Sequence, residues 1–220
     1  MASYYDAYDD GAEDVLKNTE GLVKIPEVQA LIEKEKAAAV AAKMATVDVI
    51  GDPAVASVVD SAFSSCPGLV MAFFPTATSI GRGAFDSCPN LTTANFPAVT
   101  SIGNIAFNNC SNLTTVSFPV AASIGDTAFD SCSSLTTANF PVATRIGDHA
   151  FNNCSALTTA SFPMVTSIGA RAFYSCTSLT DLTLSSMTVS EVTGGASNWE
   201  IPSGCVVHCK DGDYTVPQAA

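Results

Sequence analysis

Cysteine is the residue type of this chain with the clearest chemical potential, because six of its eight cysteines recur every 22 residues. The six are Cys66, Cys88, Cys110, Cys132, Cys154 and Cys176. Such a column could be a ladder of disulfides, a row of metal ligands, a set of nucleophiles or packing material. Each cysteine lies three residues after a phenylalanine and three before a leucine, as on one apolar face of a turn. This spacing favours packing, since free cysteine is among the most buried residue types.

Geometry argues against disulfide and metal ladders. Equivalent Cβ atoms of stacked repeats would lie about 4.8 Å apart, whereas a disulfide requires about 3.8 Å. Structural zinc sites use closely spaced cysteine pairs and histidine rather than one cysteine per repeat. The chain has one mixed cluster, Cys205, His208 and Cys209, in which His208 points away from both cysteines if the segment is a strand. We therefore predict no metal site.

Catalytic motifs are missing from the sequence. The chain has two histidines, His149 and His208, and neither stands in a Ser/His or Cys/His motif. No phosphate-binding or dinucleotide-binding glycine pattern is present. The acidic stretch that begins at Asp6 has Lys17 where a calcium-binding loop requires its final acidic residue. We predict no enzymatic activity and no cofactor, and a hydrolase or metal-binding protein is the least favoured alternative.

The charge of the chain narrows the range of partners. The net charge is −12 and only 14% of the residues are charged. Such a surface repels nucleic-acid phosphates, so we predict no nucleic-acid partner. No apolar run reaches the 18 residues that a membrane span requires, so we predict no membrane insertion. The first residues, MASYYDAYDDGAED, lack the apolar core of a signal peptide, which indicates cytoplasmic synthesis without ordinary export.

A single repeat of 22 residues accounts for the cysteine column and for most of the chain. One phenylalanine column consists of Phe63, Phe85, Phe107, Phe129, Phe151 and Phe173. A second column, in which proline follows each member, consists of Phe74, Phe96, Phe118, Phe140 and Phe162. The unit reads I-G-x-x-A-F-x-x-C-x-x-L-T-T-x-x-F-P-x-x-x-S. So many matched columns indicate a repeat architecture rather than chance similarity.

Each unit contains two periods. Apolar residues spaced by three or four through residues 80–91 predict a short helical turn. The segment TTANF predicts a strand with Ala94 and Phe96 pointing inward. Pro97 ends that strand, because proline cannot donate a hydrogen bond to a sheet. We expect Gly81 and its equivalents to adopt an unusual backbone angle before the turn, which glycine permits.

Stacking of these units predicts the fold, because one unit cannot bury its apolar face alone. We predict an α/β repeat solenoid with a parallel sheet on one face and short helical turns on the other. The pattern SIGxxAFxxCxxLTTxxFP resembles the BspA-type (Treponema-like) leucine-rich repeat over about residues 47–209, with Leu91, Ala94 and Phe96 in its L-x-x-L-x-L skeleton. The resemblance implies a leucine-rich-repeat fold. Members of that family are bacterial surface and adhesion proteins, and similar arrays occur in tail-associated proteins of phages of gut Firmicutes.

The ends of the array depart from the repeat, as capping units do. The predicted regions are an acidic arm and helix at 1–43, the solenoid at 44–190 and a C-terminal cap at 191–220. Residues 1–43 would serve as a cap, or as a segment for attachment to a neighbour or a second copy. The segment SEVTGGASNW stands where the next helical turn of the repeat is expected, and it lacks the pattern of that turn. The strand position returns at 201–207, and Asp211-Gly212 predicts the turn of a hairpin that covers the last edge.

Polar side chains that alternate outward on the strands form the candidate binding face. They are Thr93, Asn95, Thr115, Ser117, Thr137, Asn139, Thr159, Ser161, Asp181 and Thr183. Repeat proteins use such faces for binding, although threonine also suits strands through its β-propensity. A second candidate surface consists of the variable turn pairs Arg82-Gly83, Asn104-Ile105, Asp126-Thr127 and Asp148-His149, together with Arg171.

These observations predict a non-enzymatic structural and recognition module. We expect it to bind a protein or glycan receptor on a cell surface. The resemblance, together with the missing signal sequence, favours an adhesion component of a phage virion, in a tail or fibre. A bacterial cell-surface adhesin of the BspA type is the alternative, so the expected location is a virion or a cell surface. Residues 1–43 would then contact virion neighbours or form a homo-oligomer.

Overall fold

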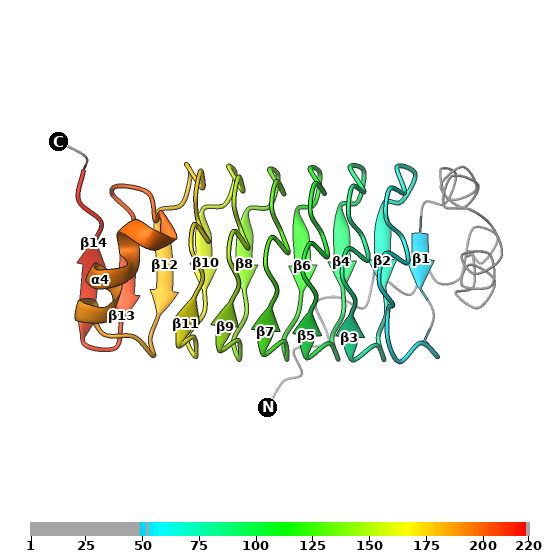
Figure 1. Cartoon of the computed structure of the whole chain (residues 1–220), viewed down its shortest axis with the longest axis horizontal. Coiled ribbons are helices and arrows are strands. Elements are labelled where there is room, and N and C mark those ends of the chain that lie inside the picture. The colour runs from blue at the N-terminus through cyan, green and yellow to red at the C-terminus, as the bar shows by residue number, and fades with distance from the viewer. Residues whose placement is uncertain (1–48, 52, 219–220) are drawn as a thin grey trace, which may run out of the picture.

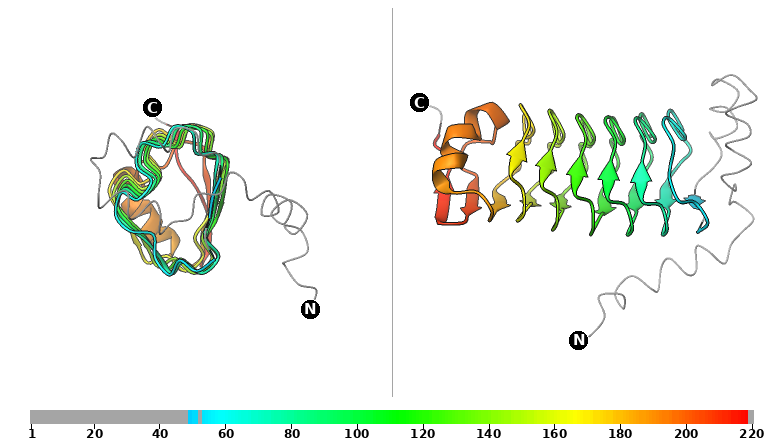
Figure 2. Two further views of the ribbon diagram at one scale, coloured as in Figure 1. Left: turned by 90° about the vertical axis from the view of Figure 1, so that its right-hand side faces the viewer. Right: turned by 60° about the horizontal axis from the view of Figure 1, so that its bottom comes forward.

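The computed structural model describes residues 49–51 and 53–218, which form one elongated solenoid (Figure 1). Viewed along its long axis, the rungs superimpose on one another (Figure 2). The arm and helix expected at 1–43 lie outside the described residues.

The first parallel sheet carries one strand from each rung. Its strands are β1 (Val49–Gly51), β2 (Met71–Phe73), β4 (Thr93–Asn95), β6 (Thr115–Ser117), β8 (Thr137–Asn139), β10 (Thr159–Ser161) and β12 (Asp181–Leu184). The register follows the 22-residue repeat, so that Thr93 pairs with Thr115 and Asn95 with Ser117. The predicted solenoid and its parallel sheet are confirmed.

A second parallel sheet, which the sequence analysis did not predict, forms another wall of the solenoid. Its two-residue strands are β3 (Ser79–Ile80), β5 (Ser101–Ile102), β7 (Ser123–Ile124), β9 (Arg145–Ile146) and β11 (Ser167–Ile168). The isoleucines are buried, whereas the residue before each of them is partly or fully exposed. Each of these strands is too short to show an alternating pattern in the sequence, and the second sheet is therefore not predictable from that pattern.

The segment with helical spacing consists of successive tight turns. In one rung, Asp86 N–H donates to the Gly83 carbonyl at 3.1 Å and Leu91 N–H to the Cys88 carbonyl at 3.1 Å. Gly83 and Ser87 both have φ of +58°, and left-handed residues interrupt an α-helix. Their amides donate instead to the next rung, as Ser87 N–H does to the Asn108 carbonyl at 2.8 Å. The turns therefore add rung-to-rung hydrogen bonds along a third wall.

The glycine that follows each isoleucine is required by close packing rather than by its backbone angle. Gly81 and its equivalents do not have positive φ, so the expected unusual angle is wrong. A Cβ built on Gly103 would lie 2.7 Å from the carbonyl carbon of Gly81 in the preceding rung. No side chain therefore fits between the rungs at this column.

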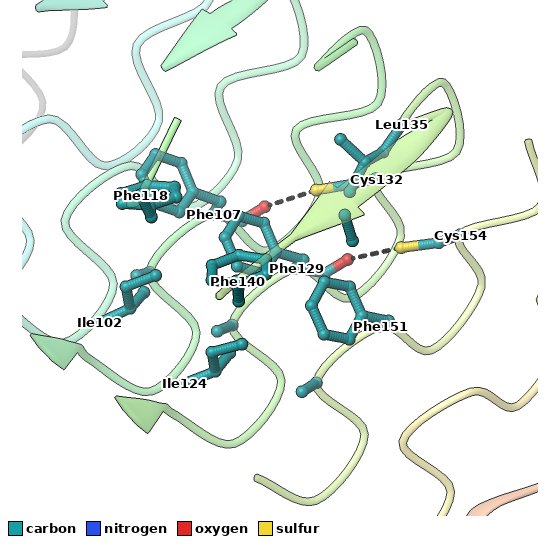
Figure 3. Close-up of a cluster of buried hydrophobic side chains, with 14 of the residues drawn as sticks. Ile102, Phe107, Phe118, Ile124, Phe129, Cys132, Leu135, Phe140, Phe151 and Cys154 are labelled. Carbon is teal, nitrogen blue, oxygen red and sulfur yellow. Dashed lines mark hydrogen bonds between the residues drawn. The ribbon is translucent and has the colours of Figure 1, made fainter. Parts of the chain in front are cut away.

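Two columns of phenylalanine fill the interior (Figure 3). Within the first column, Phe85 and Phe107 stack with centroids 5.1 Å apart and planes at 4°. Within the second column, Phe96 and Phe118 stack at 5.5 Å and 7°. The columns meet edge to face, as Phe85 and Phe96 do at 5.7 Å and 63°. Both arrangements are favourable for aromatic rings, so the core is continuous from rung to rung.

The hydrogen-bond ladder of the first sheet is interrupted between β6 and β8, whereas the second sheet is continuous from β3 to β11. Val116 points inward at the interruption, where the neighbouring rungs carry Ala94 and Ala138. The rings of Phe118 and Phe140 also lie slightly farther apart, at 5.8 Å, than the other pairs of their column. The local separation of these two rungs coincides with the larger inward side chain of Val116.

The C-terminal end contains a helix, α4 (Val189–Trp199), that the sequence analysis missed. Thr188 and Glu191 form a capping box, since the Thr188 side chain accepts from Glu191 N–H and the Glu191 carboxylate accepts from Thr188 N–H. The helix takes the place of a turn segment: Phe173 N–H donates to the Trp199 carbonyl at 2.9 Å. The helical turn expected at this position of the repeat is therefore replaced by α4 and is not lost. With 11 residues, α4, the one helix in the described part of the chain, is too short to cross a bilayer.

The predicted C-terminal hairpin consists of β13 (Val206–Cys209) and β14 (Gly212–Thr215), which pair antiparallel. Strand β13 adds parallel to β12 with Asp181 opposite Val206, an offset of 25 residues rather than the expected 22. The offset is larger because α4 is longer than the turn segment that it replaces. Lys210 and Asp211 form the turn, and Gly212 is the first residue of β14.

Candidate functional site

The six repeated cysteines are buried in the wall of the solenoid, as the packing hypothesis predicted. They also donate hydrogen bonds, which that hypothesis did not include: Cys132 Sγ lies 3.2 Å from the Phe107 carbonyl oxygen and Cys154 Sγ 3.1 Å from that of Phe129 (Figure 3). All eight cysteines lie among the described residues and are free thiols. Burial raises the pKa of Cys110 and of Cys176 to about 12. Thiols of this kind remain protonated at neutral pH and are poor nucleophiles.

The cluster at the C-terminus is arranged as the strand pattern predicted. Cys205 is buried and Cys209 aligns with the inward Leu184, whereas His208 lies on the outer face. The residues therefore do not converge on one point. Within the described residues, no group of three or more histidine, cysteine, aspartate or glutamate side chains could hold a metal ion.

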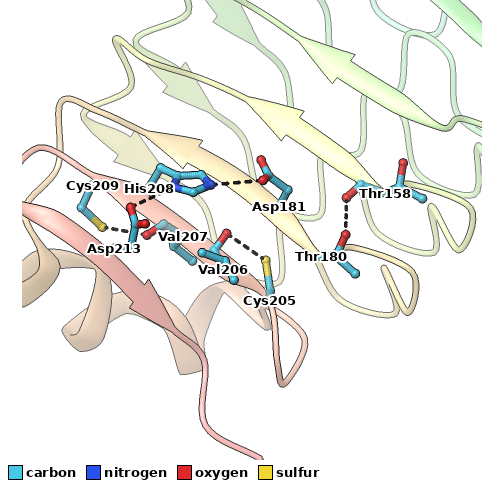
Figure 4. Close-up of polar contacts among 9 residues, drawn as sticks. All are labelled: Thr158, Thr180, Asp181, Cys205, Val206, Val207, His208, Cys209 and Asp213. Carbon is cyan, nitrogen blue, oxygen red and sulfur yellow. Dashed lines mark hydrogen bonds and ion pairs between the residues drawn. The ribbon is translucent and has the colours of Figure 1, made fainter.

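His208 instead connects the last three strands of the first sheet (Figure 4). Its Nδ1 lies 2.8 Å from Asp213 Oδ1 on β14, and its Nε2 lies 3.1 Å from Asp181 Oδ2 on β12. Hydrogen bonds to Asp213 and then to Asp181 raise the pKa of His208 above its usual value. The imidazolium form can donate to both carboxylates at once, whereas a neutral ring can donate to only one. The sequence pattern does not predict this contact, because Asp181 lies 27 residues from His208.

The ten predicted face residues all lie on the outer surface of the first sheet, in two columns. The first column contains Thr93, Thr115, Thr137, Thr159 and Asp181, and the second contains Asn95, Ser117, Asn139, Ser161 and Thr183. Their strands lie side by side in Figure 1. The columns end at Met71 and Phe73 on β2 and at the His208 contact on β13. Whether they bind a ligand stays a prediction.

Hydrogen bonding distinguishes this face from the neighbouring threonine column and from the turn column, but not from the second sheet, whose outward Ser101, Ser123 and Ser167 also form no side-chain hydrogen bond in the described structure. Among the described residues, the polar side chains of β4, β6, β8 and β10 on this face, and Thr183, form no side-chain hydrogen bond, while Asp181 contacts His208. One residue earlier in four of the rungs, a threonine hydroxyl donates to a carbonyl of the preceding rung; these threonines are Thr92, Thr114, Thr158 and Thr180. Thr114 Oγ1, for example, lies 3.2 Å from the Thr92 carbonyl oxygen, and Thr158 Oγ1 lies 3.0 Å from that of Thr136. The outer face therefore keeps donors and acceptors for a ligand.

The second candidate surface, on the turns, has a structural role at Asn104, Asp126 and Asp148. Asn104 Oδ1 accepts from Asp126 N–H at 3.0 Å, and Asp148 Oδ1 accepts from Ala170 N–H at 2.8 Å. The residue after each of these side chains has positive φ, +52° at Ile105 and +54° at His149. These side chains stabilise rung stacking and are less free to bind a ligand. In the sequence, this structural role was indicated by asparagine or aspartate at one fixed position of the repeat, at residues 104, 126 and 148.

Comparison with known proteins agrees with this architecture. The model of the BspA-type leucine-rich repeat region matches residues 45–158 and 122–196, in six copies. A leucine-rich repeat protein from Bacteroides ovatus ATCC 8483 is 20% identical over 74% of this chain and 52% of its own, with a TM-score of 0.54. The leucine-rich repeat protein of T. pallidum is 26% identical over 60% of this chain and 77% of its own, with a TM-score of 0.53.

The comparison with curated proteins found no match. This chain spans about half the length of the Bacteroides ovatus protein. The family model, in contrast, covers more than half of this chain, and the matched residues are those whose rungs form both parallel sheets. The protein therefore belongs to the BspA-type leucine-rich-repeat family.

Proposed function

We propose that this protein is a non-enzymatic recognition module that binds a protein or glycan on a surface through the outer face of its first sheet. The observation that supports this function is the set of polar side chains on β4 to β10 that have no internal hydrogen-bond partner. In the neighbouring threonine and turn columns, by contrast, side chains such as those of Thr114 and Asn104 are already paired within the solenoid. Repeat proteins commonly bind through such an extended face.

The test is a triple variant of the face with a matched control on the second sheet. Thr115, Thr137 and Asn139 are changed to lysine in one full-length protein, and Ser101, Ser123 and Ser167 in the other. We expect binding to receptor-bearing cells, measured by flow cytometry, to be lost in the first variant and retained in the second. Equal binding by both variants, with unchanged thermal unfolding, would refute the proposed face.

For the biological setting, we propose an adhesion component of a phage virion, with a bacterial cell-surface adhesin as the alternative. The resemblance of the repeat to arrays in tail-associated phage proteins supports the first, and the bacterial surface proteins that the BspA-type family includes support the second. Mass spectrometry of purified virions and of fractionated cell walls distinguishes them. Enrichment in cell walls and absence from virions would favour the adhesin. Stoichiometric zinc in the purified protein would instead support a metal-binding protein.

A further inference from the structure

We infer that the ligand of the first sheet is a linear, uncharged polysaccharide that lies along the solenoid axis and repeats every second sugar. This inference rests on the proposed function and names the chemical class of its ligand. Three features of the outer face carry it: its lack of charge, its hydrogen-bonding groups beside an apolar edge, and its two-rung period.

The face is uncharged over four rungs of a strongly acidic protein. The outward side chains of β4, β6, β8 and β10 are threonine, serine and asparagine, while the chain as a whole carries a net charge of −12. An anionic polymer would be repelled by the surrounding field. A cationic peptide would find no carboxylate on these four strands with which to pair. Charge complementarity therefore favours a neutral ligand.

The groups on the face suit a sugar chain. Hydroxyl and amide side chains both donate and accept hydrogen bonds, as sugar hydroxyls do. At the corners that follow β6, β8 and β10, prolines precede exposed apolar side chains at Val120, Val142 and Met164, which are 42%, 42% and 52% accessible. An apolar edge beside a hydrogen-bonding surface matches the two kinds of surface that a pyranose ring presents: hydroxyls at its rim and C–H groups on its faces.

The spacing of the face suggests how the polysaccharide repeats. In the second column, Asn95, Ser117, Asn139 and Ser161 alternate amide and hydroxyl from rung to rung. The amide therefore recurs every two rungs, or about 10 Å at the usual strand spacing. In an extended β-1,4-linked chain, successive sugars are turned over, so that the same edge of the polymer recurs with every second sugar. A polymer with a disaccharide repeat can present equivalent groups to each asparagine.

The experiment measures binding of the full chain to β-1,4-linked oligomers of glucose and of N-acetylglucosamine, with two, four and six sugars, by titration calorimetry. We expect one series to bind about tenfold more tightly at four sugars than at two, with little gain at six, because the uncharged face spans four rungs. Changing Asn95 and Asn139 to serine should weaken binding of the longer oligomers about tenfold. Changing Ser101 and Ser123 to asparagine on the second sheet should not.

The outcomes separate this inference from the proposed function. If the protein binds cells through the lysine-sensitive face but binds neither oligomer series, the ligand class is wrong and the proposed function stands. Equal affinity for two and six sugars, or tighter binding to a sulfated polysaccharide, would also overturn the inference. If the lysine variants of the face bind cells as the wild type does, the face is not the site and both proposals fail.

Discussion

A column of alternating aspartate and asparagine gives a physical reason for the paired repeat. Asn108 Nδ2 donates to Asp86 Oδ1 at 2.8 Å, and Asn152 Nδ2 donates to Asp130 Oδ1 at 2.9 Å. Two carboxylates one rung apart would repel each other, and the intervening amides prevent that contact. The alternation ends at Asn152, because the next rung carries Tyr174. The Oδ1 of Asn152 is buried without a hydrogen-bond partner. A 44-residue unit therefore has lower electrostatic cost than a 22-residue unit with aspartate in every rung.

Changing Asn108 to aspartate tests this column. The variant loses one hydrogen bond and places a third carboxylate between Asp86 and Asp130, so its free energy of unfolding should fall by roughly 1–2 kcal/mol at neutral pH. Urea denaturation measures the change, which should shrink at acidic pH as the carboxylates become protonated. Asn139→Asp introduces the same charge between Ser117 and Ser161 and should cost clearly less. Equal losses would contradict the account.

The contact of His208 with two carboxylates predicts a pH-dependent stability of the C-terminal hairpin. The pKa of His208 is raised in the folded protein by its bonds to Asp213 and Asp181. Its stabilising contribution is therefore complete below the unfolded value of about 6.5. The contribution is lost as the pH rises through the higher folded value.

The measurement compares the urea midpoints of the wild type and His208→Asn from pH 5.5 to pH 9. We expect the wild type to be the more stable protein at pH 5.5 and the difference to disappear toward pH 9. His149→Asn serves as the control, because His149 forms no side-chain hydrogen bond in the described structure. A difference between wild type and His208→Asn that grows with pH would show that the sign is wrong.

At the scale of the elements, close backbone approach and left-handed turns distinguish this rung from a helix-bearing repeat. A Cβ on Gly125 would lie 2.6 Å from Asn104 N and from the Gly103 carbonyl carbon. The turns donate their amides to the next rung, which an α-helix could not do because its amides are bonded internally. Within residues 53–218, the C-terminal rung, in which α4 replaces the turns, departs from this arrangement.

Two glycine-to-alanine changes should have opposite effects. Gly125→Ala forces two rungs apart and should destabilise the protein by about 3 kcal/mol, at the upper end for an overpacked interior. Gly194→Ala, in α4, meets no atom within 4 Å and should stabilise it by about 1 kcal/mol through helix propensity. Thermal unfolding of both proteins measures the two shifts. A Gly125→Ala protein as stable as the wild type would show that the rungs can separate without cost.

At the scale of the whole molecule, the solenoid is a one-dimensional stack in which each rung contacts its neighbours. The phenylalanine columns, the thiol donors and the threonine ladders all connect one rung to the next. An interior residue therefore contributes to two interfaces, whereas a residue of the last rung meets the different packing of α4.

Phe129→Ala should therefore be among the most destabilising single changes. Phe129 stacks on Phe107 and on Phe151, each at 5.3 Å, and its removal should cost about 4 kcal/mol. Amide hydrogen exchange should increase in the rungs on both sides of the change. In Phe173→Ala, which has one stacked neighbour at 6.0 Å, the increase should be confined to the C-terminal rungs. A uniform increase throughout the solenoid in both variants would contradict a rung-by-rung stack.

The sequence alone determined the repeat, the inward columns, the first parallel sheet and the ten outward face residues. These follow from patterns that depend on neighbours in the chain and on a fixed period: alternation in strands such as Thr93–Asn95, proline after Phe96, and cysteine between phenylalanine and leucine. The hairpin was also predicted, from Asp211-Gly212, although its register was not.

The contacts between rungs became visible in the three-dimensional structure and could not be predicted from the sequence. The second sheet, the reason for Gly103, the thiol donor of Cys132 and the contact of His208 with Asp181 and Asp213 all depend on residues about 20 or more positions apart, or on a partner strand. A linear pattern shows which residues recur, but hydrogen bonds depend on the distance and direction between atoms. For the same reason, the sequence cannot separate the unpaired outward threonines of the first sheet from the hydrogen-bonded threonines one residue earlier, because it shows threonine at both positions.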